Sequence, residues 1–340
     1  MRYIIIGAGA VGGTIGGRLA GSGHEVVLVA RGAHRAALED GGLRLKVPEG
    51  ELTYRLPVVE GPDGLGELRA DDVLVLAVKT QDSTAALQTW GPAPVADGGT
   101  AAERLPLFCA QNGVESQRLA LRTFRNVYGV CVWLPCAHVE PGVVSAAGDP
   151  LTGILHLGRH PHGTDETARL VAADLERSHF EAPVVADVAR WQYAKLLSNL
   201  ANALEAVTGP LESDEAVALV NRVKAEGAAV LDAAGIPYAS TEEQRAVRGD
   251  KVFLVPLHGT PRGGGSSWQS LSRGTGTIEA DYLNGEIALL GRLHDVPTPL
   301  NDLLQRLANT FAREHRAAGS MPVAELVRLA EKEAGDGASA

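Results

Sequence analysis

Residues 2–31 read RYIIIGAGAVGGTIGGRLAGSGHEVVLVAR, and the rest of the chain is interpreted outward from this stretch. It begins with an apolar run of β-formers at Tyr3–Ile6 and passes through glycines into a helix of small residues from Val11 to Gly23. A second apolar strand follows at Glu25–Val29. The order strand, glycine turn, helix and strand predicts a dinucleotide-binding βαβ unit.

The glycine motif of this turn is Gly7-Ala8-Gly9-Ala10-Val11-Gly12. Gly7 permits the tight turn, Gly9 lets the backbone approach a pyrophosphate, and Gly12 lets the helix pack closely on the strand. Unpaired N–H groups at the helix start would face the phosphates, and the helix dipole adds to the attraction. We therefore expect all six residues to bind the cofactor. The alternative is a glycine-rich turn without a nucleotide, but the flanking strand and helix argue against it.

The residue that ends the second strand indicates which dinucleotide binds. NAD-binding sites usually carry Asp or Glu here, which accepts hydrogen bonds from the ribose 2′-OH. This chain has Ala30 and Arg31 instead, followed by His34 and Arg35. A carboxylate would repel a 2′-phosphate, whereas a guanidinium can pair with it through two hydrogen bonds. The sequence predicts NADP(H) with Arg31 at the 2′-phosphate; alternatively, both arginines are solvated loop residues.

Composition limits the class of protein. The 340 residues favour two domains, and 45% hydrophobic and 21% charged residues are ordinary for a soluble globular protein. A net charge of −10 without a basic patch argues against nucleic-acid or membrane-surface partners. Three cysteines without metal-ligand spacing, no signal peptide and no long apolar run lead us to expect a cytoplasmic protein with no bound metal.

Strands and helices alternate over the first half of the chain and predict a doubly wound, largely parallel sheet. Expected strands are 43–47, 52–56, 72–79, 105–110, 128–134 and 182–185, and expected helices are 83–90 and 166–177. We expect 141–145 and 153–158 to pair as antiparallel strands. Lys79 and Asn112 follow two of the strands, and ligands of such sheets bind beyond the carboxyl ends. Both side chains should therefore lie on the same rim as the glycine turn.

From about residue 187 the pattern becomes helical, interrupted by Gly/Pro-rich stretches at 258–265 and 296–299. Expected helices are 190–207, 214–234, 242–255, 279–294, 299–314 and 321–333. We predict an α/β Rossmann-type doubly wound sheet over residues 1–186, followed by an all-α C-terminal domain over residues 187–334. The last residues, 335–340, should be a flexible tail.

A polar stripe crosses the first of these apolar helices. Lys195, Ser198, Asn199 and Asn202 are spaced i, i+3, i+4 and i+7, which places them on one helical face. A lysine with two amides on an otherwise apolar helix favours a buried, hydrogen-bonding wall, and a buried lysine needs a ligand or a carboxylate. Alternatively, the stripe faces solvent and the Lys195 ammonium simply extends into water.

A second polar cluster comprises residues 265–270 and 277–285. Thr277 followed by Glu279 and Asp281 before an apolar run is typical of a helix N-terminal cap. A cap leaves the serine pair Ser266 and Ser267 unexplained. Both a cap and a ligand site therefore stay open for this cluster.

Together these motifs resemble the ketopantoate reductase family (2-dehydropantoate 2-reductases) over nearly the whole chain. The resemblance implies that Lys195 is the general acid and that Lys79 and Asn112 contact the cofactor. It also implies that Asn199, a serine and Glu279 hold the substrate or position the lysine. The matching segments, in order, are Gly7–Gly12, Lys79-Thr80, Asn112-Gly113, Trp191…Lys195…Asn199, Ser266-Ser267-Trp268-Gln269 and Glu279–Gly285.

The chain departs from the family pattern at two places. The family often has a second asparagine eight residues after the lysine, where this chain has Ala203, and Asn202 stands one position earlier. Between Gln269 and Glu279 the chain is one residue longer than the usual pattern. The substrate-binding serine can therefore be Ser266 or Ser267.

The resemblance implies an NADP-dependent oxidoreductase of pantothenate biosynthesis that reduces a small 2-keto acid to the 2-hydroxy acid in a cleft between the domains. Lys195 would polarise the carbonyl oxygen and deliver a proton, with Glu279 as the second catalytic residue. Asn199, Asn202 and the serine pair would bind the substrate. Alternatives are a dehydrogenase for another hydroxy acid or an amino-acid-derived substrate, and a non-catalytic NADP(H) sensor. The sequence leaves the oligomeric state open, with a homodimer as one option.

Overall fold

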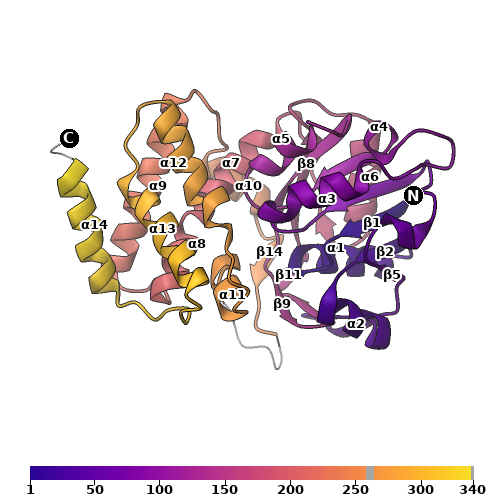
Figure 1. Ribbon diagram of the computed structural model, residues 1–340, viewed down its shortest axis with the longest axis horizontal. Helices are drawn as coiled ribbons and strands as arrows, with labels where there is room; N and C mark the ends of the chain where they lie inside the picture. Colours follow the sequence, from indigo (N-terminus) through magenta and orange to yellow (C-terminus); the bar gives the residue numbers. More distant parts are fainter. Residues whose placement is uncertain (258–263, 338–340) are drawn as a thin grey trace. The chain divides into compact units, whose positions relative to one another are not determined.

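The computed structural model describes residues 1–257 and 264–337, which fold into two compact units (Figure 1). The first unit is built from Met1–Gln192 together with Ala239–Pro261, and the second from Tyr193–Tyr238 together with Arg262–Ala340. The expected α/β Rossmann-type sheet and all-α C-terminal part are both confirmed. The assignment of cofactor binding to residues 1–186 and of substrate binding to residues 187–334 concerns function and stays a prediction.

An eight-stranded sheet forms the centre of the first unit. Neighbouring strands run parallel except at β8 and β12, which are antiparallel. From β1, the strands β2 and β5 follow on one side, and β6, β7, β8, β12 and β13 follow on the other. The strand order therefore reverses between β1 and β6. In order across the sheet, the strands are β13 (Phe180–Glu181), β12 (Gly153–Arg159), β8 (Asn126–Trp133), β7 (Pro106–Cys109), β6 (Asp72–Leu76), β1 (Arg2–Ile6), β2 (Glu25–Val29) and β5 (Val58–Val59).

Both faces of this sheet are covered by apolar cores. Ile5 and Leu28 face one core, which includes side chains of α1 (Ala10–Gly21) and α6 (Glu166–Glu176). Ile4 and Val27 face the other, which includes α3 (Ser83–Trp90), α4 (Ala101–Arg104) and α5 (Glu115–Ala120). Strands that are buried on both faces must be apolar at consecutive positions, which is why these segments read as unbroken apolar runs.

A second, four-stranded sheet corrects one prediction. Its order is β4 (Gly50–Tyr54), β3 (Leu43–Val47), β10 (Val143–Ala146) and β9 (Cys136–Glu140). The predicted pairing of residues 141–145 with 153–158 is wrong, because β10 pairs with β3 and β9 whereas β12 joins β8 in the large sheet. Both strands are fully buried along most of their length, so an apolar pattern alone could not indicate which sheet each one joins.

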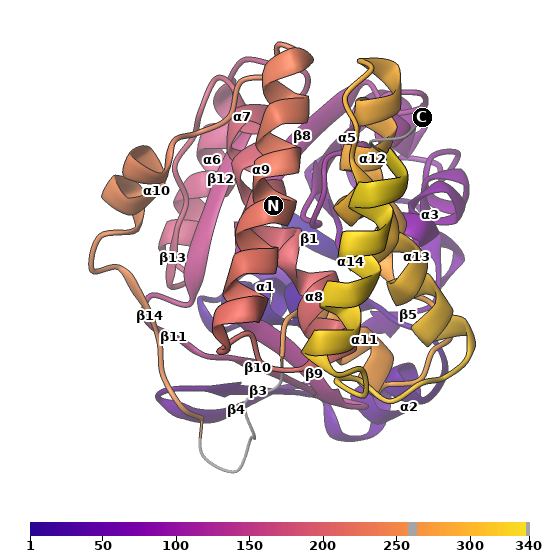
Figure 2. The same ribbon diagram turned by 90° about the vertical axis from the view of Figure 1, so that its left-hand side faces the viewer.

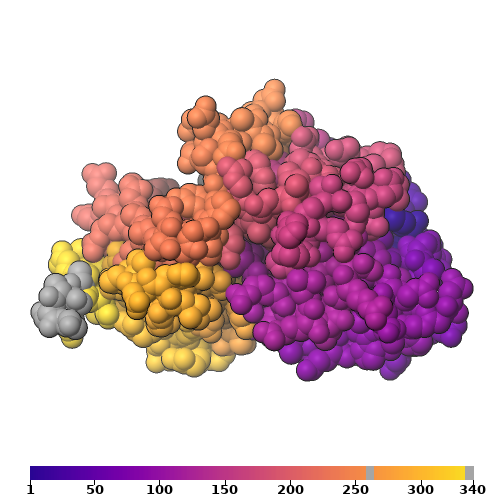
Figure 3. Space-filling model, turned by 90° about the horizontal axis from the view of Figure 1, so that it is seen from above, coloured from indigo at the N-terminus to yellow at the C-terminus, as the bar shows by residue number. Residues whose placement is uncertain are grey.

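Residues 239–257 return to the first unit and correct a second prediction. The expected helix 242–255 ends early: α10 spans Thr241–Arg248 and stops at Gly249, whose φ is 46°. The chain then forms β14 (Val252–Leu254), which pairs antiparallel with β11 (Gly148–Pro150). Figure 3 shows these residues in orange against the pink surface of the first unit. The expected strand 182–185 is likewise replaced by β13 and a single bridge between Val184 and Leu157.

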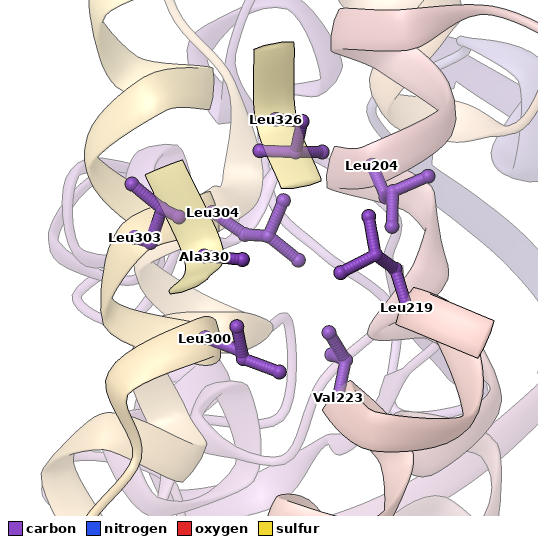
Figure 4. A pocket seen from close by; sticks show the side chains of 8 residues that line it. All are labelled: Leu204, Leu219, Val223, Leu300, Leu303, Leu304, Leu326 and Ala330. Atoms are coloured by element: carbon purple, nitrogen blue, oxygen red, sulfur yellow. The ribbon is translucent and has the colours of Figure 1, made fainter. Parts of the chain in front are cut away.

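The second unit is helical. Four of its helices, which Figure 2 shows from their side of the molecule, pack around a small cavity. The cavity is lined only by aliphatic side chains (Figure 4). These helices are α8 (Ala201–Thr208), α9 (Asp214–Ala233), α13 (Pro299–Arg313) and α14 (Val323–Gly337). The lining residues are Leu204, Leu219, Val223, Leu300, Leu303, Leu304, Leu326 and Ala330. The unit also contains α11 (Ser266–Ser272) and α12 (Asn284–Leu293).

Two expected helices are each divided in two. The predicted helix 190–207 is α7 (Val188–Asn199) followed by α8, with Leu200 between them. The predicted helix 279–294 begins as a short 3₁₀ turn, η3 (Glu279–Tyr282), and restarts as α12 after Leu283, whose ψ is −88°. Helical periodicity cannot show a one-residue interruption, because the apolar spacing continues through it.

The remaining elements are short. They are α2 (Gly32–Gly41), η1 (Pro62–Leu65) and η2 (Thr80–Asp82). Helix α14 extends to Gly337, which overlaps the tail predicted at 335–340, and the last residues of that tail lie outside the described part. The Gly/Pro-rich stretch expected at 258–265 also lies mostly outside it. Among the described residues, no helix combines the length and the apolar character needed to cross a bilayer.

Candidate functional site

The turn between β1 and α1 has a different steric environment at each glycine of the motif. Gly7 has a φ of 103°, and a Cβ there would lie 2.8 Å from the Val78 backbone nitrogen. A Cβ at Gly12 would lie 2.1 Å from the Gly7 carbonyl oxygen. At Gly9, by contrast, a Cβ would have no protein atom within 4 Å. Gly7 and Gly12 are thus required by the fold itself, whereas Gly9 leaves open space in front of the turn.

Backbone N–H groups at the same turn are available to an anion. Gly9 is the N-cap of α1, with no side chain capping the helix, and its carbonyl accepts the Gly13 N–H at 2.7 Å. The Gly9 N–H itself donates to no atom of the described residues. Helix N-termini attract phosphate groups through such N–H donors and through the helix dipole. The turn therefore fits a dinucleotide pyrophosphate by its donors as well as by its space.

Lys79 and Asn112 lie on the same rim of the sheet as the glycine turn. β1, β6 and β7 are adjacent and parallel, and their carboxyl ends are in register, with Ile6 beside Leu76 and Leu76 beside Cys109. Lys79 follows β6 and precedes η2, while Asn112 follows β7. The hydroxyl of Thr80 donates to the Asn112 carbonyl at 3.4 Å. The predicted rim is therefore present, at the point where the strand order reverses.

Gln111 also helps to build this rim, although the sequence interpretation missed it. Its side-chain nitrogen donates to the Val78 carbonyl and to the Ser83 hydroxyl, each at 2.8 Å. These two bonds join the loop after β7 to the loop after β6, which carries Lys79. The only sequence signal was a polar residue at the end of the apolar run 105–110, directly before Asn112.

Arg31 and Arg35 differ in their ion pairs. Arg35 is held by Glu39 and by Glu60, with N–O distances of 2.8 Å to each. Arg31 is exposed at the N-cap of α2 and forms no ion pair within the described part of the chain. An arginine whose charge is already balanced is a poor site for an added phosphate. Among the residues that the structure describes, carboxylates balance the guanidinium charge of Arg35 but not that of Arg31.

In the second unit, α7 carries Lys195 and Asn199 one turn apart. Asn199 is buried and Lys195 is partly buried. Ser198 is exposed, and its hydroxyl donates to the Ala194 carbonyl at 3.4 Å. The polar stripe is therefore not uniform: Ser198 faces solvent, as the alternative interpretation expected, while Asn199 does not.

Asn202 and Ser266 are brought together from distant parts of the sequence. The Asn202 amide nitrogen donates to the Ser266 hydroxyl at 3.4 Å, which links α8 to the start of α11. Beside them the Glu205 carboxylate accepts the Gly265 N–H at 2.8 Å. Ser267 is buried, with 2% of its surface exposed. Sequence reasoning missed Glu205, whose signal was its position one helical turn after Asn202.

Glu279 lies in η3 and is buried, with 4% of its surface exposed. The capping interpretation of its cluster is not supported, because neither η3 nor α12 has a side-chain cap. The neighbouring Asp281 instead accepts hydrogen bonds from the side chains of Gln305 and Asn309, each at 2.7 Å. Glu279 therefore requires an explanation other than helix capping.

A buried amide network lies at the break between α7 and α8. The Asn284 amide donates to the Leu200 carbonyl at 3.1 Å and to the Asn301 side-chain oxygen at 3.0 Å. Asn301 in turn donates to the Glu226 carboxylate at 2.8 Å. Glu226 also accepts the Leu300 and Asn301 N–H groups at the start of α13, and burial raises the pKa of its carboxyl. The Leu200 carbonyl at the break between α7 and α8 thus accepts a hydrogen bond from Asn284, which lies 84 residues later in the sequence.

Comparison with known proteins gives consistent matches over both units. The family model described as ketopantoate reductase PanE/ApbA matches residues 3–162, and the model described as ketopantoate reductase PanE/ApbA C terminal matches residues 187–312. A 2-dehydropantoate 2-reductase of Pyrococcus horikoshii is 26% identical, over 94% of this chain and 100% of that protein.

Two solved structures share the fold. A PanE/ApbA family ketopantoate reductase from Ralstonia eutropha JMP134 is 28% identical with a TM-score of 0.75, over 93% of this chain and 100% of that chain. A D-mandelate dehydrogenase solved with NADH and anilino(oxo)acetate has a TM-score of 0.76 at 22% identity, over the same shares of the two chains. At that identity the second likeness concerns the fold alone.

Proposed function

Because the chain belongs to the ketopantoate reductase family and is a nicotinamide-dependent oxidoreductase, we propose that it reduces a small, 2-dehydropantoate-like 2-keto acid with NADPH. The bound cofactor supplies the hydride that the keto carbon receives. The protein must then bind the acid, orient its carbonyl and stabilise the charge that develops on the oxygen. The observation that carries the proposal is that Asn202 on α8 meets Ser266 on α11 in the same unit that carries Lys195 and Asn199 on α7.

Cofactor binding is assigned to the first unit. Residues Gly7–Gly12 would hold the pyrophosphate, and Lys79 and Asn112 would contact the cofactor from the loops after β6 and β7. The choice of NADP(H) rests on Arg31, which is exposed and without an ion pair in the described residues, whereas Arg35 is paired twice. A guanidinium in this state can pair with a 2′-phosphate through two hydrogen bonds.

Substrate binding and proton transfer are assigned to the second unit. Lys195 would stabilise the developing alkoxide and donate the proton to it, a role that typically contributes ~10²–10⁴-fold to the rate. Buried Glu279 would be the second catalytic residue and position the lysine. Asn199, Asn202 and the serine pair would bind the carboxylate and hydroxyl groups of the substrate. The contact with Asn202 favours Ser266 over the buried Ser267 as the serine that meets substrate.

The test is NADPH oxidation with a panel of 2-keto acids: 2-dehydropantoate, pyruvate, 2-ketoisovalerate and phenylglyoxylate. We expect turnover with 2-dehydropantoate and its loss in the Lys195→Ala variant, while NADPH still binds. Turnover confined to another acid would instead indicate a dehydrogenase for that hydroxy acid. Tight NADPH binding without turnover on any acid would indicate a sensor and overturn the proposed activity.

A further inference from the structure

We propose that His34 is a positioning residue for cofactor binding, because it holds the Ala8–Gly9 peptide so that the Gly9 N–H faces the pyrophosphate. The inference rests on the proposed binding of the dinucleotide at the glycine turn. His34 lies on α2, outside the glycine motif. Its imidazole reaches back to the turn, where Nε2 lies 2.7 Å from the Ala8 carbonyl oxygen.

The tautomer of His34 follows from its second neighbour. The Gly142 N–H donates to Nδ1 at 3.0 Å, so Nδ1 must carry a lone pair. The proton of the neutral ring is then on Nε2, and Nε2 donates to the Ala8 carbonyl. The ring of His138 lies beside Nδ1, with its Nε2 at 3.2 Å and the two ring centroids 4.6 Å apart. Burial lowers the pKa of His34, which keeps the ring in this neutral form near neutral pH.

The hydrogen bond to Ala8 fixes the direction of the neighbouring N–H. In a planar trans peptide the carbonyl of one residue and the N–H of the next point in opposite directions. With the Ala8 oxygen turned toward His34, the Gly9 N–H must point away from the imidazole. On its other side the turn is fixed by β2, since the Gly7 and Ala8 N–H groups donate to the Val29 carbonyl at 3.2 and 3.0 Å. The two preceding peptides are therefore anchored to β2, whereas the Ala8–Gly9 peptide itself is oriented by its bond to His34.

Two observations at Gly9 leave room and a donor for a ligand. The Gly9 N–H has no acceptor among the described residues, and a Cβ built on Gly9 would meet no atom within 4 Å. His34 does not act as a direct phosphate ligand, because its one N–H is taken by Ala8 and its lone pair by Gly142. Its contribution is orientation: a peptide already turned toward the phosphate loses less entropy when the cofactor binds.

The test compares two substitutions by titrating NADPH and NADH onto the protein and following fluorescence. His34→Phe keeps a flat ring but has no donor, whereas His34→Gln has an amide nitrogen that can reach the Ala8 carbonyl. We expect His34→Phe to raise Kd by roughly 3- to 10-fold for both cofactors, since both contain the pyrophosphate. His34→Gln should stay within about 3-fold of the wild type by the same scale.

Two comparisons separate positioning from other roles. Arg31→Ala should weaken NADPH far more than NADH, unlike His34→Phe. His162→Phe, at an exposed histidine of the first unit, should change neither Kd. An unchanged Kd in His34→Phe would overturn the inference. So would a loss in His34→Gln as large as that in His34→Phe, because a donor restored at this position would then not restore cofactor binding.

One measurement reads the state of His34 directly in the wild-type protein. Nitrogen NMR of ¹⁵N-histidine-labelled wild-type protein reports which ring nitrogen of His34 carries the proton, with His34→Gln giving the assignment. A protonated Nε2 is expected before and after NADPH is added, and a protonated Nδ1 in the neutral ring would overturn the inference. If the wild type bound neither cofactor, the proposed function would fail, whereas the tautomer would still be measurable.

Discussion

The glycine turn of the first unit and the polar stripe on α7 and α8 are both candidate ligand sites, but they are built over very different distances along the chain. The turn is formed by consecutive residues, and its tightest steric limit is local, because a Cβ at Gly12 would overlap the carbonyl of Gly7. The stripe depends on Ser266 and Asn284, which lie 64 and 84 residues from the atoms that they contact. The first site can therefore be recognised from a local motif, whereas the second needs the folded unit.

The largest expected effect is at the turn itself. Gly9→Val should abolish NADPH binding and leave the melting temperature nearly unchanged, because the added side chain enters space that only a ligand would fill. Gly12→Ala should instead cost about 1–3 kcal/mol of stability, since its Cβ would overlap the Gly7 carbonyl. Isothermal titration and thermal unfolding of both variants check the pair. Near-native NADPH affinity in Gly9→Val would mean that the turn is only structural.

The next effect concerns chemistry in the second unit. Lys195→Ala should slow single-turnover hydride transfer at saturating keto acid by ~10²–10⁴-fold, because both the proton donor and the positive charge are lost. NADPH affinity should change little, since the residues proposed to hold the cofactor belong to the first unit. Ser198→Ala, on the exposed part of the same stripe, is the matched control and should keep the wild-type rate. If the rate of Lys195→Ala stayed within a few-fold of the wild-type rate, Lys195 would be a solvent-facing side chain without a role in catalysis.

Cofactor choice should show a smaller effect. Arg31→Ala should weaken NADPH by about 1.5–3 kcal/mol, the range for hydrogen bonds to charged groups, and NADH far less. Arg35→Ala is a fitting control, because Arg35 is already paired with Glu39 and Glu60. Dissociation constants for the two cofactors decide the matter. Equal losses of NADPH and NADH binding in Arg31→Ala would show that this side chain does not meet the 2′-phosphate.

The smallest expected effect is on the long-range support of the stripe. Asn284→Leu should lower the free energy of unfolding by about 1–3 kcal/mol, because it leaves the buried Leu200 carbonyl without its donor. Asn309→Leu, which loses one exposed hydrogen bond to Asp281, should stay within about 0.5 kcal/mol. Urea unfolding measures both changes. If the two variants were equally stable, the network at Asn284 would not be holding the break between α7 and α8.

Much of the first unit was predictable because its signals are local. The strands at 2–6, 25–29 and 72–76 are apolar runs followed by turns, and the positions of Lys79 and Asn112 followed from the rule for parallel sheets. His34 and Gln111 were not predicted as part of the site. Each acts through a hydrogen bond to a backbone carbonyl, and such a bond leaves no mark on spacing or composition.

The failed predictions have a common physical cause. The pairing partners of residues 143–146 and 153–159 could not be chosen from their apolar pattern, because buried strands of either sheet look alike. The helix predicted at 242–255 gives way to β14 after Gly249, where pairing with β11 outweighs local helical preference. In both cases contacts between segments far apart in sequence decided the structure.

By itself the sequence determined the βαβ unit, the helical second half and the family, because each depends on residue order and short-range spacing. Only the tertiary structure decided that Arg31 and not Arg35 lacks an ion pair among the described residues, that Asn202 meets Ser266, and that Asn284 pairs the Leu200 carbonyl. These are hydrogen bonds and ion pairs between segments that meet only after folding. Their geometry depends on packing, which a linear pattern does not encode.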